Sequence, residues 1–202
     1  MLAAFTAGLL LITVSELGDK TFFIAMILAM RHSRRLVLVG VVAALAVMTV
    51  LSVLLGQVVS LLPAEWVHYA EVVLFLGFGI KLLLDASRMA DQCDLTEQRE
   101  AEAVVVKAEK HWANTSWAVV LEAFVLTFVA EWGDRTQLAT IALAAANHPL
   151  GVTSGAIIGH TICAAIAVMG GRYLAGRISE RTITALGGIL FLVFGAIAAA
   201  NR

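Results

Sequence analysis

Residues 16–21 of this chain read Glu-Leu-Gly-Asp-Lys-Thr, and residues 131–136 read Glu-Trp-Gly-Asp-Arg-Thr. Each copy of this acidic motif lies inside a long apolar run, where an ionisable side chain is unfavourable and by default marks a functional site. A charged motif repeated in corresponding positions of two halves is typical of transporters whose substrate site lies between internal repeats. The motif pair therefore predicts both the architecture of the chain and the place of its site.

The composition is that of a membrane protein. Of the 202 residues, 60% are hydrophobic and 14% are charged, whereas soluble domains carry roughly 25% charged residues. The mean hydropathy is +0.91, and apolar runs of about 20 residues, long enough to cross a bilayer, recur along the chain. No basic patch is interleaved with aromatic residues, so a nucleic-acid partner is not expected. We predict an all-α polytopic membrane protein surrounded by the lipid bilayer.

Apolar runs predict six transmembrane helices, and the first and fourth of them contain the two motifs. Pro63 and Pro149, the only prolines, lie in the turns after the second and fourth runs, which supports these helix ends. The runs extend over about 3–30, 36–61, 67–88, 117–146, 151–174 and 182–200. We therefore expect a three-helix repeat over residues 1–88, a cytoplasmic linker over 89–115 and a second three-helix repeat over 116–202.

Charges in the loops predict the orientation of the chain. The turns after the second and fourth runs contain no Lys or Arg, whereas the other connections are basic, so the positive-inside rule places the basic connections in the cytoplasm. Both termini are then outside. Because each half has an odd number of spans, the second half would enter the membrane in the opposite sense, which gives two inverted repeats. Glycines at matching positions, such as Gly40 and Gly155, extend the repeat beyond the motifs.

The motif acids Glu16, Asp19, Glu131 and Asp134 are the candidate metal ligands. On a helix, two acids three residues apart face the same way, and their position near the middle of each apolar run places them near the bilayer midplane. The glycine between them weakens the helix and would ease a local break that frees backbone carbonyls as ligands. If inverted halves pack face to face, all four carboxylates converge at one central point.

The other motif residues complete an oxygen-rich site. Lys20 and Arg135 follow the aspartates directly, and four acids with two bases give a formal charge of −2, which one divalent cation would neutralise. Further polar groups that can line the transport pathway are Ser15, Thr21, Thr136 and Gln137. Sites built only from oxygen suit Mg²⁺, Ca²⁺ and Mn²⁺. When the cation leaves, clustered carboxylates in a low dielectric favour their protonated form, so metal and protons would compete for the same acids.

Several alternatives to cation–proton exchange remain open on the residues alone. The acids could pair with the neighbouring bases simply to hold helices together, or the chain could be a passive divalent cation channel or carry another substrate such as an amino acid. An intramembrane aspartyl protease needs two catalytic carboxylates and a cleft, but it does not need an adjacent cation or a same-face glutamate. We therefore expect no enzymatic activity and no cofactor.

Ionisable residues outside the repeat have weaker expectations. His160 in the fifth run is expected to be a hydrogen-bonded packing residue, with a ligand or proton relay as the alternative. Glu122, near the start of the fourth run, is expected to extend to the membrane interface, with gating as the alternative. Lys81 and Asp85 are expected to pair near the cytoplasmic end of the third run. The central segment mixes both charge signs and is expected to be a solvated helix or linker, with a regulatory role as the alternative.

The doubled Glu-x-Gly-Asp-Lys/Arg-Thr/Ser motif, one per three-span half, resembles that of the cation exchanger family that includes bacterial manganese exporters and Golgi Mn²⁺/Ca²⁺–proton antiporters. The resemblance covers essentially the whole chain. It implies Mn²⁺ efflux from the cytoplasm in exchange for protons across a bacterial inner membrane, with Ca²⁺ as an alternative cargo and a homo-oligomer as a compatible assembly. It also implies that the motif acids bind the cation, and that the rest of the motif is Lys20, Thr21, Arg135 and Thr136.

Overall fold

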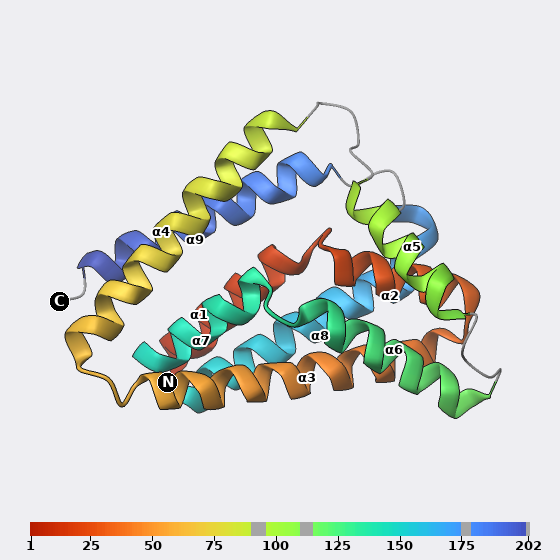
Figure 1. Cartoon of the computed structure of the whole chain (residues 1–202), viewed down its shortest axis with the longest axis horizontal. Coiled ribbons are helices and arrows are strands. Elements are labelled where there is room, and N and C mark those ends of the chain that lie inside the picture. The colour runs from red at the N-terminus through yellow and green to blue at the C-terminus, as the bar shows by residue number, and fades with distance from the viewer. Residues whose placement is uncertain (90–95, 110–114, 175–178, 201–202) are drawn as a thin grey trace.

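The computed structural model describes residues 1–89, 96–109, 115–174 and 179–200, and every regular element within these ranges is an α-helix. The helices are α1 (Leu2–Glu16), α2 (Lys20–Arg31), α3 (Arg34–Val59), α4 (Ala64–Arg88), α5 (Thr96–Glu109), α6 (Ser116–Glu131), α7 (Arg135–Ala146), α8 (Pro149–Leu174) and α9 (Glu180–Ala200) (Figure 1). The all-α class predicted from the sequence is therefore confirmed.

Four helices, α3, α4, α8 and α9, are each long and apolar enough to cross a membrane. The other two predicted spans are broken. Helices α1 and α2 are bent by 66° relative to each other, α6 and α7 are bent by 73°, and each pair is apolar enough to count as one span. The local break expected at the motif glycine is therefore confirmed, and the two acids of each motif do not share one face of a continuous helix.

The two breaks share one local cause. Gly18 has a φ of 75° and Gly133 a φ of 83°, a left-handed conformation that glycine adopts without the steric penalty of a side chain. The aspartate that follows each glycine starts the next half-helix. A carboxylate oxygen of Asp19 accepts a hydrogen bond from the Lys20 backbone N–H at 2.9 Å, and Asp134 accepts one from the Thr136 backbone N–H at 3.3 Å. These N-terminal caps satisfy backbone donors that the break leaves without a helical partner.

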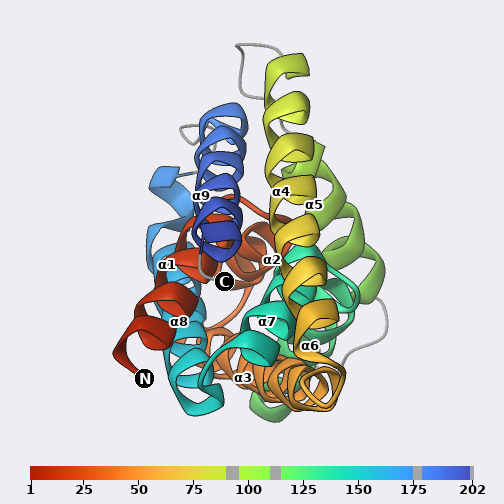
Figure 2. The ribbon, with the colours of Figure 1, turned by 90° about the vertical axis from the view of Figure 1, so that its left-hand side faces the viewer.

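The two breaks lie at the centre of the molecule (Figure 1). The start of α1, the end of α9 and the connection from α3 to α4 are at one end, and α5 is at the other. The ends of α2, α4 and α8, which the basic connections follow in the sequence, lie toward the α5 end. Helices α4 and α9 lie side by side (Figure 2) and run antiparallel (Figure 1).

Close helix crossings recur at equivalent positions of the two halves. Gly40 on α3 lies against the backbone carbonyl of Val120 on α6, and Gly155 on α8 lies against the backbone carbonyl of Phe5 on α1. The offset in residue number that relates the two motifs also relates Gly40 to Gly155 and Phe5 to Val120. A side chain at either glycine would meet backbone, so small residues here allow the close approach that is common between membrane helices.

The α4–α9 pair shows the same reciprocity. A Cβ atom at Gly79 would lie 2.7 Å from the Leu192 side chain, and one at Gly195 would lie 2.7 Å from the Leu76 side chain. Each helix therefore presents a glycine to a leucine of its neighbour at matching positions. The crossing holds the third predicted span of each half against the other.

Helix α5 covers the buried helix α2. Residues 21–29 of α2 are all buried, and Ala101 and Val105 of α5 are fully buried in the same apolar cluster. The prediction of a solvated helix or linker is therefore right about the helix but wrong about its solvation, because one face of α5 packs against the transmembrane part. The remaining residues of the predicted linker, 90–95 and 110–114, lie outside the described part of the chain.

We expect Gly155→Ala to lower the unfolding midpoint of the purified protein in detergent. The added methyl group would press against the backbone of Phe5, and overpacking of this kind costs about 1–3 kcal/mol. Gly77→Ala is the matched control, because no atom lies within 4 Å of a Cβ at Gly77. An unchanged midpoint for Gly155→Ala would contradict the close approach of α1 and α8.

Candidate cation site

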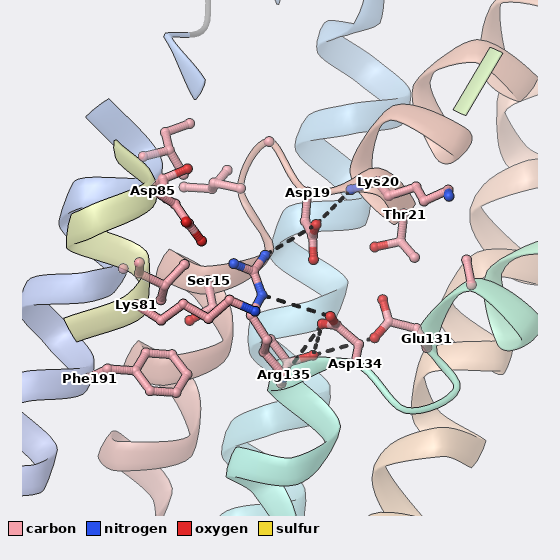
Figure 3. A pocket seen from close by; sticks show the side chains of 18 of the residues that line it. Ser15, Asp19, Lys20, Thr21, Lys81, Asp85, Glu131, Asp134, Arg135 and Phe191 are labelled. Atoms are coloured by element: carbon pink, nitrogen blue, oxygen red, sulfur yellow. Dashed lines mark hydrogen bonds and ion pairs between the residues drawn. The ribbon is translucent and has the colours of Figure 1, made fainter. Parts of the chain in front are cut away.

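The two helix breaks bring acids from both motifs together. Glu16 ends α1, while Asp19 and Asp134 cap the starts of α2 and α7. These three residues each offer a carboxylate oxygen, and the three oxygens lie within 4.8 Å of one another. Carboxylates this close repel one another when ionised, so the arrangement favours a bound cation or protons. Figure 3 shows Asp19 and Asp134 directed toward a common space.

The two motif glutamates are held in the same way. Thr21 Oγ1 donates a hydrogen bond to Glu16 Oε2 at 3.2 Å, and Thr136 Oγ1 donates one to Glu131 Oε2 at 3.4 Å. Both glutamates are only 2% exposed. The other oxygen of each, Oε1, is buried and has no hydrogen-bond partner among the described residues. A buried oxygen left in this way is unfavourable, and either a proton or a metal ion would satisfy it.

Glu131 differs from the other three acids in its position. It is not one of the three residues whose oxygens lie within 4.8 Å of one another, although it lines the same cavity (Figure 3). The structure therefore brings together three of the four predicted ligands and places the fourth beside them. Thr136 links this fourth acid to the cluster, because its hydroxyl also lies 3.0 Å from Asp134 Oδ2.

The two motif bases occupy different surroundings. Arg135 extends between the motifs: its Nη2 atom lies 3.6 Å from Asp19 Oδ1, and its Nε atom lies 3.9 Å from Asp134 Oδ1. Lys20 instead forms an ion pair with Glu100 of α5, at 3.0 Å from Nζ to Oε2. Arg135 therefore offsets the negative charge of the cluster directly, whereas the charge of Lys20 is matched by a helix outside the predicted spans.

A cavity of about 460 Å³ connects the motif residues with the α5 end of the molecule. Ser15 lines its inner part together with Asp19, Glu131 and Asp134, and the Ser15 Oγ atom is buried without a hydrogen-bond partner among the described residues. Toward α5 the lining residues include three ionisable side chains, Lys81, Asp85 and Glu100. The cavity therefore leads from the helix breaks toward the side of the molecule that carries the basic connections.

Gln137 positions one of the breaks. Its Oε1 atom accepts a hydrogen bond from the Gly133 backbone N–H at 2.7 Å, and its Nε2 atom lies 3.1 Å from Met48 Sδ on α3. It is not among the residues that line the cavity. The side chain fixes the turn that presents Asp134, and a role for it in the transport pathway stays a prediction.

Two residues outside the repeat differ from their sequence-based interpretation. Glu122 is only 2% exposed, and its Oε2 atom lies 3.9 Å from His32 Nε2, so its side chain is enclosed by the protein and does not extend out of it. His160 is buried as expected, but its Nδ1 atom has no hydrogen-bond partner among the described residues. Neither side chain lines the central cavity.

Sequence reasoning missed the contribution of α5 to the site. Glu100 lies in a segment of mixed charge, in which no single acid stands out. Its partner Lys20 is 80 positions away in the sequence, so the sequence gave no reason to pair them. Lys81 and Asp85 could have been identified from the sequence, because charged residues within an apolar run are by default candidates for a functional site. They were expected only to pair with each other, whereas both line the cavity.

Comparison with known proteins gives a consistent result. A family model described as divalent cation/proton antiporter GDT1 matches residues 4–90 and 119–202. The chain is 63% identical to a GDT1-like protein of Synechocystis, over 98% of this chain and 97% of that protein. It is 43% identical to the chloroplastic protein PAM71-homolog of Arabidopsis thaliana, over 96% of this chain and 58% of that protein. No solved structure shows significant similarity to the chain.

The caps at the helix breaks can be separated experimentally from the charge of the cluster. Asp134→Asn keeps a side-chain oxygen that can cap α7 and removes one of the clustered charges, so we expect an unfolding midpoint at or above that of the unaltered protein in metal-free detergent. Asp134→Ala removes the cap and should cost about 1 kcal/mol. Equal destabilisation by both substitutions, measured by thermal unfolding, would contradict the capping role.

Proposed function

The chain belongs to the GDT1 family of divalent cation/proton antiporters, and from this premise we propose that it exports Mn²⁺ from the cytoplasm in exchange for protons, with Ca²⁺ as the alternative cargo. The observation that carries the proposal is the cluster of Glu16, Asp19 and Asp134 oxygens within 4.8 Å at the two helix breaks. Membership of an antiporter family also fits the expectation that the chain is not an enzyme.

The chemistry of the donors supports Mn²⁺ as cargo. The cluster offers carboxylate oxygens, and the Ser15 hydroxyl lines the same cavity. Sites built only from oxygen suit hard divalent ions. Ca²⁺ takes six to eight oxygen ligands in a flexible arrangement. Three clustered carboxylates with few further oxygens suit an ion that completes an octahedron with water, as Mg²⁺ and Mn²⁺ do. The preference for Mn²⁺ as cargo draws on the resemblance of the doubled motif.

Proton exchange follows from the state of the acids when no cation is bound. The unpartnered Oε1 atoms of Glu16 and Glu131 are buried among other carboxylates, and protonation relieves both the burial of charge and the repulsion. A divalent ion that enters must displace these protons, and its departure restores them. Arg135 keeps its charge throughout and holds Asp19 and Asp134 at a fixed separation.

Alternating access would use two inverted repeats. The reciprocal contacts of Gly40 with Val120 and of Gly155 with Phe5 support this arrangement, as does the antiparallel course of α4 and α9 (Figure 1). If the basic connections face the cytoplasm, the 460 Å³ cavity opens to the cytoplasm, both termini lie outside, and cargo reaches the motif acids from inside the cell. The expected location is a bacterial inner membrane.

The experiment that tests the proposal measures Mn²⁺ and Ca²⁺ flux in proteoliposomes. We expect Asp134→Asn to fold and to lose transport by at least roughly 10–100-fold. Mutating a residue that only hydrogen-bonds to a metal ligand already costs this much, and Asp134 is proposed to be a ligand itself. Glu65→Gln is the matched control, because Glu65 is an exposed acid on α4 that does not line the cavity. Normal Mn²⁺ flux through Asp134→Asn would overturn the assignment of the site.

The direction of the pH effect distinguishes exchange from a passive channel. Acid on the side toward which Mn²⁺ moves should accelerate transport, because protons there replace the departing ion. Acid on the side from which Mn²⁺ comes should slow transport, because protons then compete for the same carboxylates. Flux that does not change with the pH of the receiving compartment would favour a channel and contradict exchange.

A further inference from the structure

A second cavity of about 470 Å³ lies toward the end of the molecule that holds the termini. The start of α4 and the ends of α7 and α9 line it, together with Ala3 and Ala7 of α1. Glu71 of α4 is one of the lining residues, although its side chain is only 8% exposed. Within the described part of the chain, Glu71 makes no hydrogen bond or ion pair. A buried carboxylate without a partner is unfavourable in a membrane span and is by default a functional group.

The cavity offers Glu71 a single ionisable neighbour. His68 lies one helical turn before Glu71 and also lines the cavity, so the two side chains project from the same face of α4. The side chains that α1, α7 and α9 contribute to the described lining carry no ionisable group, and the other polar lining residues are Ser60 and Asn147. One carboxylate and one imidazole provide too few charged ligands to hold a divalent ion tightly, but they can accept and pass protons.

An aromatic pair separates this outer cavity from the central one. Phe75 lines the outer cavity and Phe191 lines the central cavity, and their ring centroids lie 5.7 Å apart. The ring of Phe194, which also lines the outer cavity, lies 5.9 Å from that of Phe75. Phe75 and Phe191 are each only 1% exposed. Figure 3 shows Phe191 on the side of the central cavity formed by α9.

The two cavities use equivalent surfaces of α4 and α9 but differ in charge. Phe75 and Phe191 are 116 positions apart, and the same offset carries Glu71 onto Gly187, which lines the central cavity. It also carries His68 onto Thr184, another lining residue of the central cavity. The ionisable pair is therefore present on one side of the aromatic pair and absent from the equivalent place on the other.

We propose that Glu71, assisted by His68, is the external proton-accepting station of this exchanger, from which protons reach the motif acids when the Phe75–Phe191 pair opens. The proposal rests on the proposed function and extends it from the central site to the outer path. Glu71 takes a proton from the outside medium, and the motif acids receive it as the cation leaves. Mn²⁺ binding from the cytoplasm does not involve Glu71, because the central cavity contains the metal ligands.

The test compares Glu71→Gln, Glu71→Asp and the control Glu65→Gln in proteoliposomes. We expect Glu71→Gln to lower the maximal rate of Mn²⁺ transport about tenfold or more, as loss of a positioned proton-transfer group does. Its apparent KM for Mn²⁺ on the cytoplasmic side should stay within about twofold, because the motif acids are unchanged. The dependence of the rate on external pH should become flat, and Glu71→Asp should restore it. Glu71→Gln with the unaltered rate and external pH profile would overturn the proposal.

A second measurement uses the unaltered protein and does not depend on its cargo. A hydrophobic carbodiimide modifies protonated buried carboxyl groups, and peptide mass spectrometry locates the product. In vesicles of known sidedness, the fraction of Glu71 that is labelled should rise as the external pH falls, because the reagent modifies the protonated carboxyl group. Labelling that follows the internal pH, or none at any external pH, would overturn the proposal. If the unaltered protein moves neither Mn²⁺ nor Ca²⁺, the proposed function fails, and the labelling of Glu71 still reports on the outer station separately.

Discussion

A transmembrane helix can be interrupted at the centre of a bilayer only if the backbone groups that the break exposes find partners inside the protein. In this chain the partners come from the motif and from the residue that follows its second copy. Asp19 and Asp134 cap the second half-helices, and Gln137 accepts a hydrogen bond from the Gly133 backbone N–H. The same aspartates then face each other across the centre of the molecule. The residues that make the breaks possible are therefore also the residues that make the site acidic.

The two motifs are nearly identical in sequence but not in their surroundings. Arg135 reaches both aspartates, whereas Lys20 pairs with Glu100 of α5. Helix α5 belongs to the segment between the halves, and among the described residues its ion pair with the site is made to the first motif. An exchanger built from inverted repeats must be asymmetric in any one conformation, because only one side of its site is open. Unequal pairing of the two bases fits this requirement.

The sequence predicts most of this arrangement, and what it misses has a physical cause. Apolar runs and the repeated motif were sufficient to predict the helical class and the residues at the helix breaks. A local break at the motif glycine was anticipated, but the size of each bend was not, because a glycine within an apolar run fits both a continuous and a broken helix. Glu122 is buried beside His32, a residue far away in the sequence, so its surroundings could not be read from its own run. Glu71 was overlooked because it occurs once, whereas repetition was the signal that identified the motif acids.

Exchange requires that the two cavities are never open together, and the α4–α9 crossing offers a physical basis for this. Phe75 of α4 lines one cavity and Phe191 of α9 lines the other, so the contact between their rings lies where the two helices meet between the cavities. Gly79 and Gly195 bring the two helices into close contact with Leu192 and Leu76. Tightly packed contacts of this kind switch between discrete arrangements and do not deform gradually. Under the proposed exchange, protons and metal would then share the motif acids in turn, each arriving from its own side.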